Sequence, residues 1–221
     1  MKNEKRIPSA HAGLRTGFDG VDGFLHGIYP GEVLLLGGRP GMGKSAFAKG
    51  VARAVCHDRK VLYLDMQHGK HESQKNLIVQ TGGSFGLNDI RQAIELELPA
   101  LVILDPFQRI LRTALRNAAA VLREIKIMAL EFGISFLITT ELLRTPEKRS
   151  DPIPTTGDIP NCQEILPFVD TVLLLFRHAY YDPDADRRSA ICIAEKTACA
   201  ECRSIPLQWD DAYAAFADDA V

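Results

Sequence analysis

Residues 38–45 read G-R-P-G-M-G-K-S and match the phosphate-binding pattern G-x-x-x-x-G-K-[ST]. An apolar run, Val33 to Leu36, stands just before this stretch, and Lys44 to Cys56, which follows, carries apolar residues at helical spacing. A strand, a glycine-rich turn and a helix in that order are the setting in which this pattern forms a P-loop. The sequence therefore predicts a loop that holds the phosphates of ATP or GTP together with a magnesium ion.

Each position of this loop has an expected task. Gly41 and Gly43 allow backbone turns that aim amide groups at phosphate oxygens, and the positive end of the helix dipole adds to the attraction. We expect Lys44 to reach the β- and γ-phosphates and Ser45 to bind magnesium. The residues expected to contact the nucleotide are Gly38, Arg39, Pro40, Gly41, Met42, Gly43, Lys44, Ser45 and Ala46.

An aspartate ends another apolar run, where L-V-I-L-D occupies residues 101–105. A carboxylate at the end of a buried strand is typical of the Walker B position, which faces the magnesium shell. Asp105 is therefore predicted to act with Lys44 in catalysis and with Ser45 in holding the metal. The alternative is that Asp105 caps the next turn.

The other apolar patterns indicate a wound α/β sheet. Short runs bounded by turn residues predict further buried parallel strands at Val61 to Leu64, Ile134 to Thr139 and Val172 to Phe176. A second helix is predicted over Ala114 to Phe132. Strands that alternate with helices favour a mainly parallel, twisted sheet flanked by helices.

The C-terminal part departs from this alternation. After a polar turn, the runs Ala190 to Ala194 and Ile205 to Trp209 predict an antiparallel pair that extends the sheet. The length suits one sizeable core, and we expect one domain, residues 16–221, behind an N-terminal tail of residues 1–15.

Composition narrows the possible partners. The 221 residues carry a formal net charge of -2, so a nucleic acid would have to be held by a local basic stripe. No apolar run approaches the roughly 18 residues of a membrane span, and we expect a cytoplasmic protein without a membrane partner. Five cysteines, with Cys199 and Cys202 lacking a second pair, predict reduced thiols and no zinc site.

The residues around the loop resemble the RecA-like ATPase domain of DnaB-type replicative helicases. T-G-F-D-G-V-D-G-F-L-H-G at 16–27, Y-P-G-E at 29–32 and the R-P-x-M-G-K-S form of the loop carry the likeness. It continues through L-V-I-L-D-P-F-Q at 101–108 and F-V-D-T-V-L-L-L-F-R at 168–177. RecA, KaiC and RadA proteins share parts of this pattern. The resemblance implies a RecA-like P-loop NTPase fold with ATP and Mg²⁺ as cofactors, usually in a hexameric ring around single-stranded DNA.

Two residues compete for the place of the family's catalytic glutamate after the second strand. Matched to RecA's D-x-E-H, the sequence D-M-Q-H at 65–68 puts Gln67 there, and an amide cannot accept the proton of the attacking water. Loss of a general base costs roughly 10²- to 10⁴-fold in rate. Matched to the DnaB form L-E-M, the sequence L-D-M makes Asp65 a shorter but competent base, unless it is only a hydrogen-bond acceptor at the strand end.

Two further positions bear on catalysis through the resemblance. Glu141 falls where the family carries a polar sensor, usually glutamine, and is either a replacement base or a solvated loop acid. In the hairpin that the family presents to the neighbouring subunit's nucleotide, Lys196 matches the lysine, but Ala198 stands at the place of the arginine finger. Such a finger contributes roughly 10³- to 10⁵-fold to phosphoryl transfer, so the resemblance implies an ATPase of attenuated turnover.

Candidate DNA contacts rest on the same resemblance. The family's central loops correspond roughly to residues 106–116 and 145–163. The basic residues that they offer to DNA phosphates are Arg109, Arg112, Arg116, Lys148 and Arg149. The three arginines of the first loop would share a helical stripe with Arg123 if the helix starts early, and a solvated helix face is the alternative.

We therefore expect an ATP-dependent single-stranded DNA motor in replication or recombination, acting as a hexamer or with a partner helicase. Two alternatives stay open. One is a degenerate, nucleotide-gated binding protein that modulates a helicase or recombinase. The other is a KaiC- or RadA-like ATPase in signalling or repair.

Overall fold

The computed structural model describes residues 13–71, 74–114, 117–182, 184–196 and 201–218. The strands are β1 (Val33–Gly38), β2 (Val61–Asp65), β3 (Leu77–Thr81), β4 (Leu101–Asp105), β5 (Ser135–Glu141), β6 (Thr171–Phe176), β7 (Ser189–Lys196), β8 (Glu201–Asp210) and β9 (Ala215–Asp218). The helices are α1 (Asp19–Leu25), α2 (Lys44–Cys56), α3 (Leu87–Glu97), α4 (Phe107–Ala114), α5 (Ala118–Phe132) and α6 (Cys162–Ile165). Short 3-10 turns are η1 (Pro146–Lys148), η2 (Thr156–Asp158), η3 (Leu166–Phe168) and η4 (His178–Tyr180).

All of these strands belong to one sheet, in the order β3-β2-β4-β5-β1-β6-β7-β8-β9. The strands from β3 to β6 in this order run parallel, and β7, β8 and β9 continue the sheet in antiparallel fashion. Every residue of β1, β2, β4 and β6 is buried, as is typical of parallel strands covered on both faces. The predicted fold class, including the antiparallel C-terminal extension, is confirmed.

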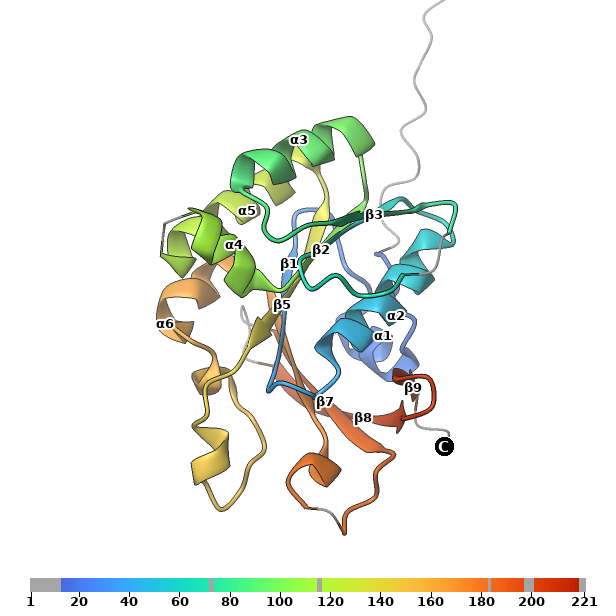
Figure 1. The fold of residues 1–221 in the computed structure, drawn as a ribbon, viewed down its shortest axis with the longest axis vertical. Coiled ribbons are helices and arrows are strands. Elements are labelled where there is room, and N and C mark those ends of the chain that lie inside the picture. The colour runs from blue at the N-terminus through green and yellow to red at the C-terminus, as the bar shows by residue number, and fades with distance from the viewer. Residues whose placement is uncertain (1–12, 72–73, 115–116, 183, 197–200, 219–221) are drawn as a thin grey trace, which may run out of the picture.

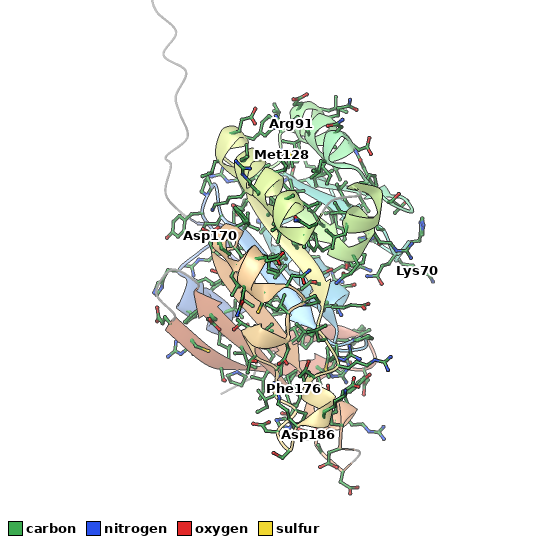
Figure 2. The ribbon with its side chains drawn as sticks, turned by 90° about the vertical axis from the view of Figure 1, so that its left-hand side faces the viewer. Lys70, Arg91, Met128, Asp170, Phe176 and Asp186 are labelled. Atoms are coloured by element: carbon green, nitrogen blue, oxygen red, sulfur yellow. The ribbon has the colours of Figure 1, made fainter. Side chains whose placement is uncertain are left out.

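Helices cover the two faces of the sheet (Figure 1). On one face α1 and α2 bury an apolar cluster that contains Phe47 and Val51. On the other face α3, α4 and α5 bury a second cluster around Leu122 and Ile125. Figure 2 shows Arg91 of α3, whose guanidinium donates two hydrogen bonds of 2.9 Å to the Glu131 carboxylate of α5. The carboxyl ends of the parallel strands meet at one edge of the sheet, which is where open α/β folds place ligands.

The helix predicted over Ala114 to Phe132 begins later than expected, at Ala118. Asn117 caps it, because its side-chain oxygen accepts a hydrogen bond of 2.7 Å from the Ala120 amide. The preceding helix α4 ends at Ala114. The early start on which a shared arginine stripe depended is therefore not observed, since Arg109 and Arg123 lie on two separate helices.

Backbone pairing reaches into the expected N-terminal tail. Leu14 exchanges two backbone hydrogen bonds of 2.8 and 2.9 Å with Ile28. Within the described part of the chain, no helix is long and apolar enough to cross a membrane. In the same part, Cys56, Cys162, Cys192 and Cys202 are free thiols, while Cys199 lies outside it.

Candidate nucleotide-binding site

The predicted P-loop joins the carboxyl end of β1 to the first turn of α2. Gly41 and Gly43 adopt positive φ angles of 82° and 91°, which favour glycine because they crowd a Cβ atom. Gly43 is the N-cap of α2, and its carbonyl accepts a hydrogen bond of 2.9 Å from the Phe47 amide. The first-turn amides of the helix therefore face the loop, as an anion-binding helix terminus requires.

Aromatic side chains from the C-terminal strands pack against this loop. A Cβ atom added to Gly43 would lie 2.7 Å from Phe216 and 2.8 Å from Trp209. The guanidinium of Arg177 in turn lies 4.2 Å from the centre of the Trp209 ring, in a cation-π contact. These residues were missed by sequence reasoning, because they follow the loop by more than a hundred positions.

Lys44 is the first residue of α2, directly after the loop, and is largely buried. Its ammonium donates hydrogen bonds of 2.9 Å to the Gly38 carbonyl and 3.2 Å to the Arg39 carbonyl. Burial lowers the pKa of Lys44 below its ordinary value, although the negative charges of Glu141 and Asp105 oppose that effect. The Lys44 ammonium thus lies close enough to Glu141 and Asp105 for their charges to affect its pKa.

Asp105, at the end of β4, is buried, and both of its carboxylate oxygens accept hydrogen bonds. Its Oδ2 atom accepts a hydrogen bond of 2.8 Å from the Tyr63 hydroxyl, and its Oδ1 atom accepts one of 2.6 Å from the Thr139 hydroxyl. Burial, followed by the charge and hydrogen bond of Asp105, raises the pKa of Tyr63 well above its ordinary value. These donors come from β2 and β5, so the carboxylate is oriented across the sheet, an arrangement that favours the Walker B interpretation over a simple cap.

Gln67 reaches the same carboxylate from the loop after β2. Its side-chain nitrogen donates a hydrogen bond of 3.0 Å to Asp105 Oδ1 and lies 3.4 Å from Ser45 Oγ. The amide of Gln67 therefore lies between the two residues predicted to hold magnesium.

Asp65, the rival candidate, has both of its carboxylate oxygens occupied. The backbone N–H of Gln67 donates a hydrogen bond of 2.7 Å to Oδ1. The backbone nitrogen of Gly69 and His71 Nε2 each lie 2.7 Å from Oδ2. Burial raises the pKa of Asp65, but the bonds from His71 and the two amides outweigh it, and the net shift is downward. Asp65 thereby fixes the loop that carries Gln67. The role of Asp65 as a base stays a prediction that this geometry does not favour.

Two other predicted residues lie beside the loop. Glu141 is the exposed last residue of β5, in register with Gly38. The guanidinium of Arg39 is turned toward the segment after β5, where it donates to the Leu142 carbonyl at 2.8 Å and to Glu147 Oε1 at 2.8 Å. Arg39 therefore anchors the loop to its neighbour in the fold, and contact between its side chain and a phosphate remains a prediction.

Three of the predicted DNA contacts, Arg109, Lys148 and Arg149, have side chains within the described part of the structure. Arg109 is exposed on α4 and Lys148 is exposed on η1. Arg149 donates hydrogen bonds of 2.8 and 3.1 Å to the buried Asp158 carboxylate, so it holds its own loop together. Arg116, Ala198 and the side chains of Arg112 and Lys196 lie outside the described part of the structure.

Three supporting residues were also missed: Tyr63, His71 and Thr139. Tyr63 precedes Asp65 by two positions on one strand, which puts their side chains on the same face, and this spacing could have identified it. His71 and Thr139 reach the acids from separate elements, a relation that no local pattern carries.

A mainly parallel sheet, with a glycine-rich phosphate loop after β1 and a buried aspartate after β4, defines a RecA-like P-loop protein. The chain belongs to the DnaB-like helicase C-terminal domain family, which matches residues 13–97 and 86–218. The resemblance to DnaB-type helicases is thus confirmed.

Individual relatives agree with this family. The replicative DNA helicase DnaB of Leifsonia xyli subsp. xyli (strain CTCB07) is 24% identical over 267 residues, which cover 99% of this chain and 58% of that protein. The DNA repair protein RadA of Aquifex aeolicus (strain VF5) is 29% identical over 127 residues, which cover 52% of this chain and 28% of that protein. The chain therefore spans little more than half the length of the DnaB relative.

The fold has close counterparts among solved structures. A structure of a DnaB-like replicative helicase, described with its interactions with primase, superposes with a TM-score of 0.85 at 19% identity. The superposition covers 97% of this chain and 65% of that one. At this level of identity the match supports the fold alone.

Proposed function

We propose that this chain binds ATP and magnesium and works as an ATP-driven, single-stranded DNA motor of DnaB-helicase type, with residues 16–221 as its ATPase domain. One observation carries the proposal: Ser45 Oγ and Asp105 Oδ1 approach the same amide nitrogen of Gln67, at 3.4 and 3.0 Å. A hydroxyl and a carboxylate that converge in this way beside a P-loop are the oxygen groups that magnesium takes in nucleotide sites.

The residues of the site would divide the work. Lys44 would leave the Gly38 and Arg39 carbonyls and pair with the β- and γ-phosphates, while Ser45 and Asp105 would hold the metal. A bound magnesium ion would supply charge neutralisation at the phosphoryl oxygens. Tyr63 and Thr139 keep the Asp105 carboxylate oriented for that task.

Gln67 would orient the attacking water without accepting its proton, as a glutamine does in some GTPases. Asp65 would keep the loop that carries Gln67 in place, because its carboxylate oxygens already bond the backbone N–H groups of Gln67 and Gly69 and the ring of His71. Glu141, whose charge acts on Lys44, is then the acid left to serve as a base. This division of roles supports slow hydrolysis unless DNA or a partner accelerates it.

Steady-state ATP hydrolysis with and without single-stranded DNA tests the proposal. We expect slow turnover by the parent protein, stimulation by DNA, and a rise of roughly 10²- to 10⁴-fold in Gln67→Glu if a general base is restored. A Glu141→Gln variant separates the two acids, because it lowers the parent rate only if Glu141 is the base. A parent protein that binds no ATP would overturn the proposal.

A nucleotide-gated binding protein is the second candidate function. It is favoured by the amide of Gln67 at the catalytic position and by the full hydrogen bonding of Asp65. ATP binding without turnover, together with ATP-dependent association with a helicase or recombinase, would support it. For the motor we also propose a hexamer or a complex with a partner helicase, and light scattering with and without ATP would test for the hexamer.

A repair ATPase is a third candidate function, because part of the chain is similar to RadA. DNA affinity that falls steeply with ionic strength would favour the DNA motor, since phosphate contacts release counterions.

A further inference from the structure

The loop that carries Gln67 closes on itself at His71. It follows strand β2 directly, and His71 Nε2 lies 2.7 Å from Oδ2 of Asp65, the residue at which the loop begins. The side chains of His71 and Asp65 are only 9% and 3% exposed. Because an ionised carboxylate can only accept a hydrogen bond, Nε2 must carry the proton of this one. His71 thereby joins the two ends of the loop at a place that is almost closed to water.

The backbone of this loop takes a conformation that depends on its contacts. His68 has a φ angle of 57°, in the left-handed region that a residue with a Cβ atom enters only at a cost. Such a conformation persists where surrounding contacts fix the backbone. Asp65 supplies two of these contacts, because its carboxylate accepts the backbone N–H groups of Gln67 and Gly69. The loop should therefore relax if the carboxylate of Asp65 is no longer fixed.

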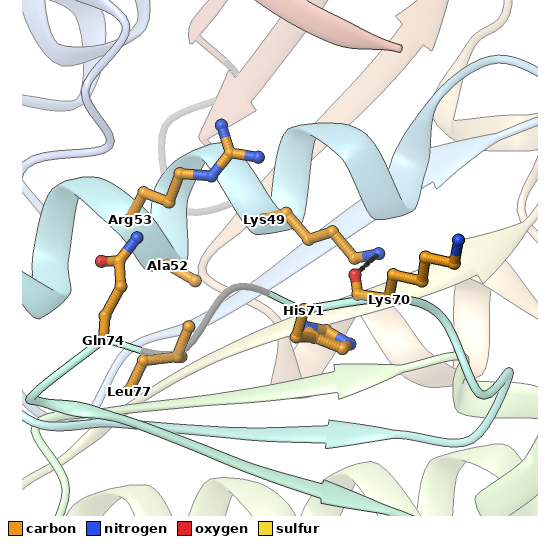
Figure 3. Close-up of a pocket in the computed structure, with 7 residues that line it drawn as sticks. All are labelled: Lys49, Ala52, Arg53, Lys70, His71, Gln74 and Leu77. Atoms are coloured by element: carbon orange, nitrogen blue, oxygen red, sulfur yellow. Dashed lines mark hydrogen bonds between the residues drawn. The ribbon is translucent and has the colours of Figure 1, made fainter. Parts of the chain in front are cut away.

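Helix α2 holds the same end of the loop from the outside. The Lys49 ammonium donates a hydrogen bond of 2.9 Å to the carbonyl of Lys70, the residue before His71 (Figure 3). A Cβ atom added to Gly69 would lie 2.9 Å from Lys49 Nζ and 3.1 Å from Asp65 Oδ2, so the backbone passes close to both side chains. Lys49 thus fixes the path of the backbone, and His71 returns from that path to Asp65.

His71 is also linked to the second acid of the site. Its ring packs edge to face with the ring of Tyr63, and the ring centres are 4.7 Å apart. The Tyr63 hydroxyl donates a hydrogen bond of 2.8 Å to Asp105 Oδ2, while the Gln67 side chain donates one of 3.0 Å to Asp105 Oδ1. Five residues therefore form a closed circuit of contacts: His71, Asp65, Gln67, Asp105 and Tyr63.

We propose that His71 is a positioning residue, which directs the side chain of Gln67 by fixing the carboxylate of Asp65. Without the bond from His71, this carboxylate could turn, and the backbone around Gln67 would lose a fixed acceptor. Gln67 would then no longer point to the place where Ser45 and Asp105 converge. The effect of His71 on ATP hydrolysis rests on the proposed function, whereas its effect on the position of Gln67 can be measured without nucleotide.

Two amide variants at His71 test this role. In His71→Gln the side-chain nitrogen can reach the place of Nε2, whereas the shorter side chain in His71→Asn brings its nitrogen only to the place of Nδ1. NMR without nucleotide follows the side-chain NH₂ signals of Gln67, which are identified by their loss in Gln67→Leu. We expect parent-like signals in His71→Gln and, in His71→Asn, a shift to the position of a free glutamine amide. His57→Asn, the same substitution at an exposed histidine, should leave the signals unchanged.

A measurement of function separates positioning from a purely structural role. In His71→Asn we expect kcat for ATP hydrolysis to fall by about 10- to 100-fold with KM for ATP little changed, because a misplaced group at the attacking water costs rate rather than binding. Binding of an ATP analogue should reach half its maximum at a lower magnesium concentration, because the Gln67 amide no longer competes for Asp105 Oδ1. A site that is merely loosened would need more magnesium instead, and that result would contradict the proposal.

Unchanged Gln67 signals in a folded His71→Asn protein would overturn the proposal, as would equal shifts in His71→Gln and His71→Asn. Thermal denaturation shows whether the variants fold. If neither does, NMR of the parent decides, because a His71 ring protonated only on Nδ1 would contradict the bond to Asp65. ATP affinity is measured separately on the parent. A parent that binds no ATP but shows the expected Gln67 signals would refute the ATPase and leave the role of His71 intact.

Discussion

The side-chain nitrogen of Gln67 donates a hydrogen bond of 3.0 Å to Asp105 Oδ1, and the same nitrogen lies 3.4 Å from Ser45 Oγ. An NH₂ group is a donor, so it suits a carboxylate neighbour without any metal. A glutamate at that position would oppose the charge of Asp105 until a cation came between them. Glutamine at position 67 can therefore bond the Asp105 carboxylate directly, without a cation between the two side chains.

The first prediction concerns metal dependence. Gln67→Glu should lower the unfolding temperature in the absence of magnesium, because two like charges then share the site, at about 1.4 kcal/mol for each pKa unit of coupling. Magnesium should recover that loss and stabilise the variant more than the parent. Thermal denaturation with and without magnesium measures both effects. Gln67→Leu, which removes the donor and adds no charge, is the control and should show no such recovery.

The second prediction concerns the phosphate loop. Lys44→Ala should weaken ATP binding by about 100-fold or more, since a charge-assisted contact of about 3 kcal/mol is removed from the phosphates. Fluorescence anisotropy with a labelled ATP analogue measures the affinity. Lys75→Gln removes an exposed lysine elsewhere and should bind as the parent does. Parent-like affinity in Lys44→Ala would mean that the nucleotide is not held by this loop.

The third prediction concerns the orientation of Asp105. Tyr63→Phe removes the hydroxyl that donates 2.8 Å to Asp105 Oδ2, and both residues are buried. We expect the free energy of unfolding to fall by about 1.5–3 kcal/mol, the range for hydrogen bonds to charged groups. Urea denaturation measures the loss, and Tyr213→Phe, at a tyrosine that is 81% exposed, is the control. The magnesium concentration for half-maximal ATP binding should also rise in Tyr63→Phe, which a purely structural role would not cause.

The fourth prediction concerns pH. The pKa of Asp65 is lowered in the folded protein, so its carboxylate stabilises the fold above the ordinary aspartate pKa of about 3.9. That contribution should disappear as the pH falls through the lower, folded-state pKa. The stability difference between the parent and Asp65→Asn should therefore shrink as the pH falls below about 4.

Urea denaturation at several pH values measures this difference. Asp19→Asn, at an exposed aspartate, should leave it near zero throughout. A difference for Asp65→Asn that does not change with pH would show that the carboxylate charge is not what stabilises the loop.

Local patterns were enough for the parts of the site that one strand and one turn build. The strand, loop and helix around residues 38–45, and the buried strand that ends at Asp105, are continuous in sequence. Helix α2 has the predicted bounds, because its apolar spacing and the glycine before it agree. Strand β3 was not predicted, since it is an edge strand of half-buried residues without a continuous buried run.

The choice between Asp65 and Gln67 could not be made from sequence, because both side chains leave the chain at the same end of β2. What separates them is His71, which partners Asp65 after a turn whose path depends on tertiary contacts. The packing of Phe216 against Gly43 could not be predicted from the sequence either, since 173 positions separate the two residues.

The last prediction tests that packing. Gly43→Ala should destabilise the protein by about 2–4 kcal/mol, because a φ angle of 91° strains an alanine and its Cβ atom would lie 2.7 Å from Phe216. Chemical denaturation measures the loss, and Gly83→Ala, where an added Cβ meets nothing within 4 Å, is the matched control. Measured against Phe216→Ala alone, adding Gly43→Ala should cost less than it does in the parent, because the clash with Phe216 is gone while the close approach to Trp209 and the backbone strain stay. An equal cost in both backgrounds would show that the Phe216 ring does not restrict this position, and that Trp209 and the strain in the turn are what restrict it to glycine.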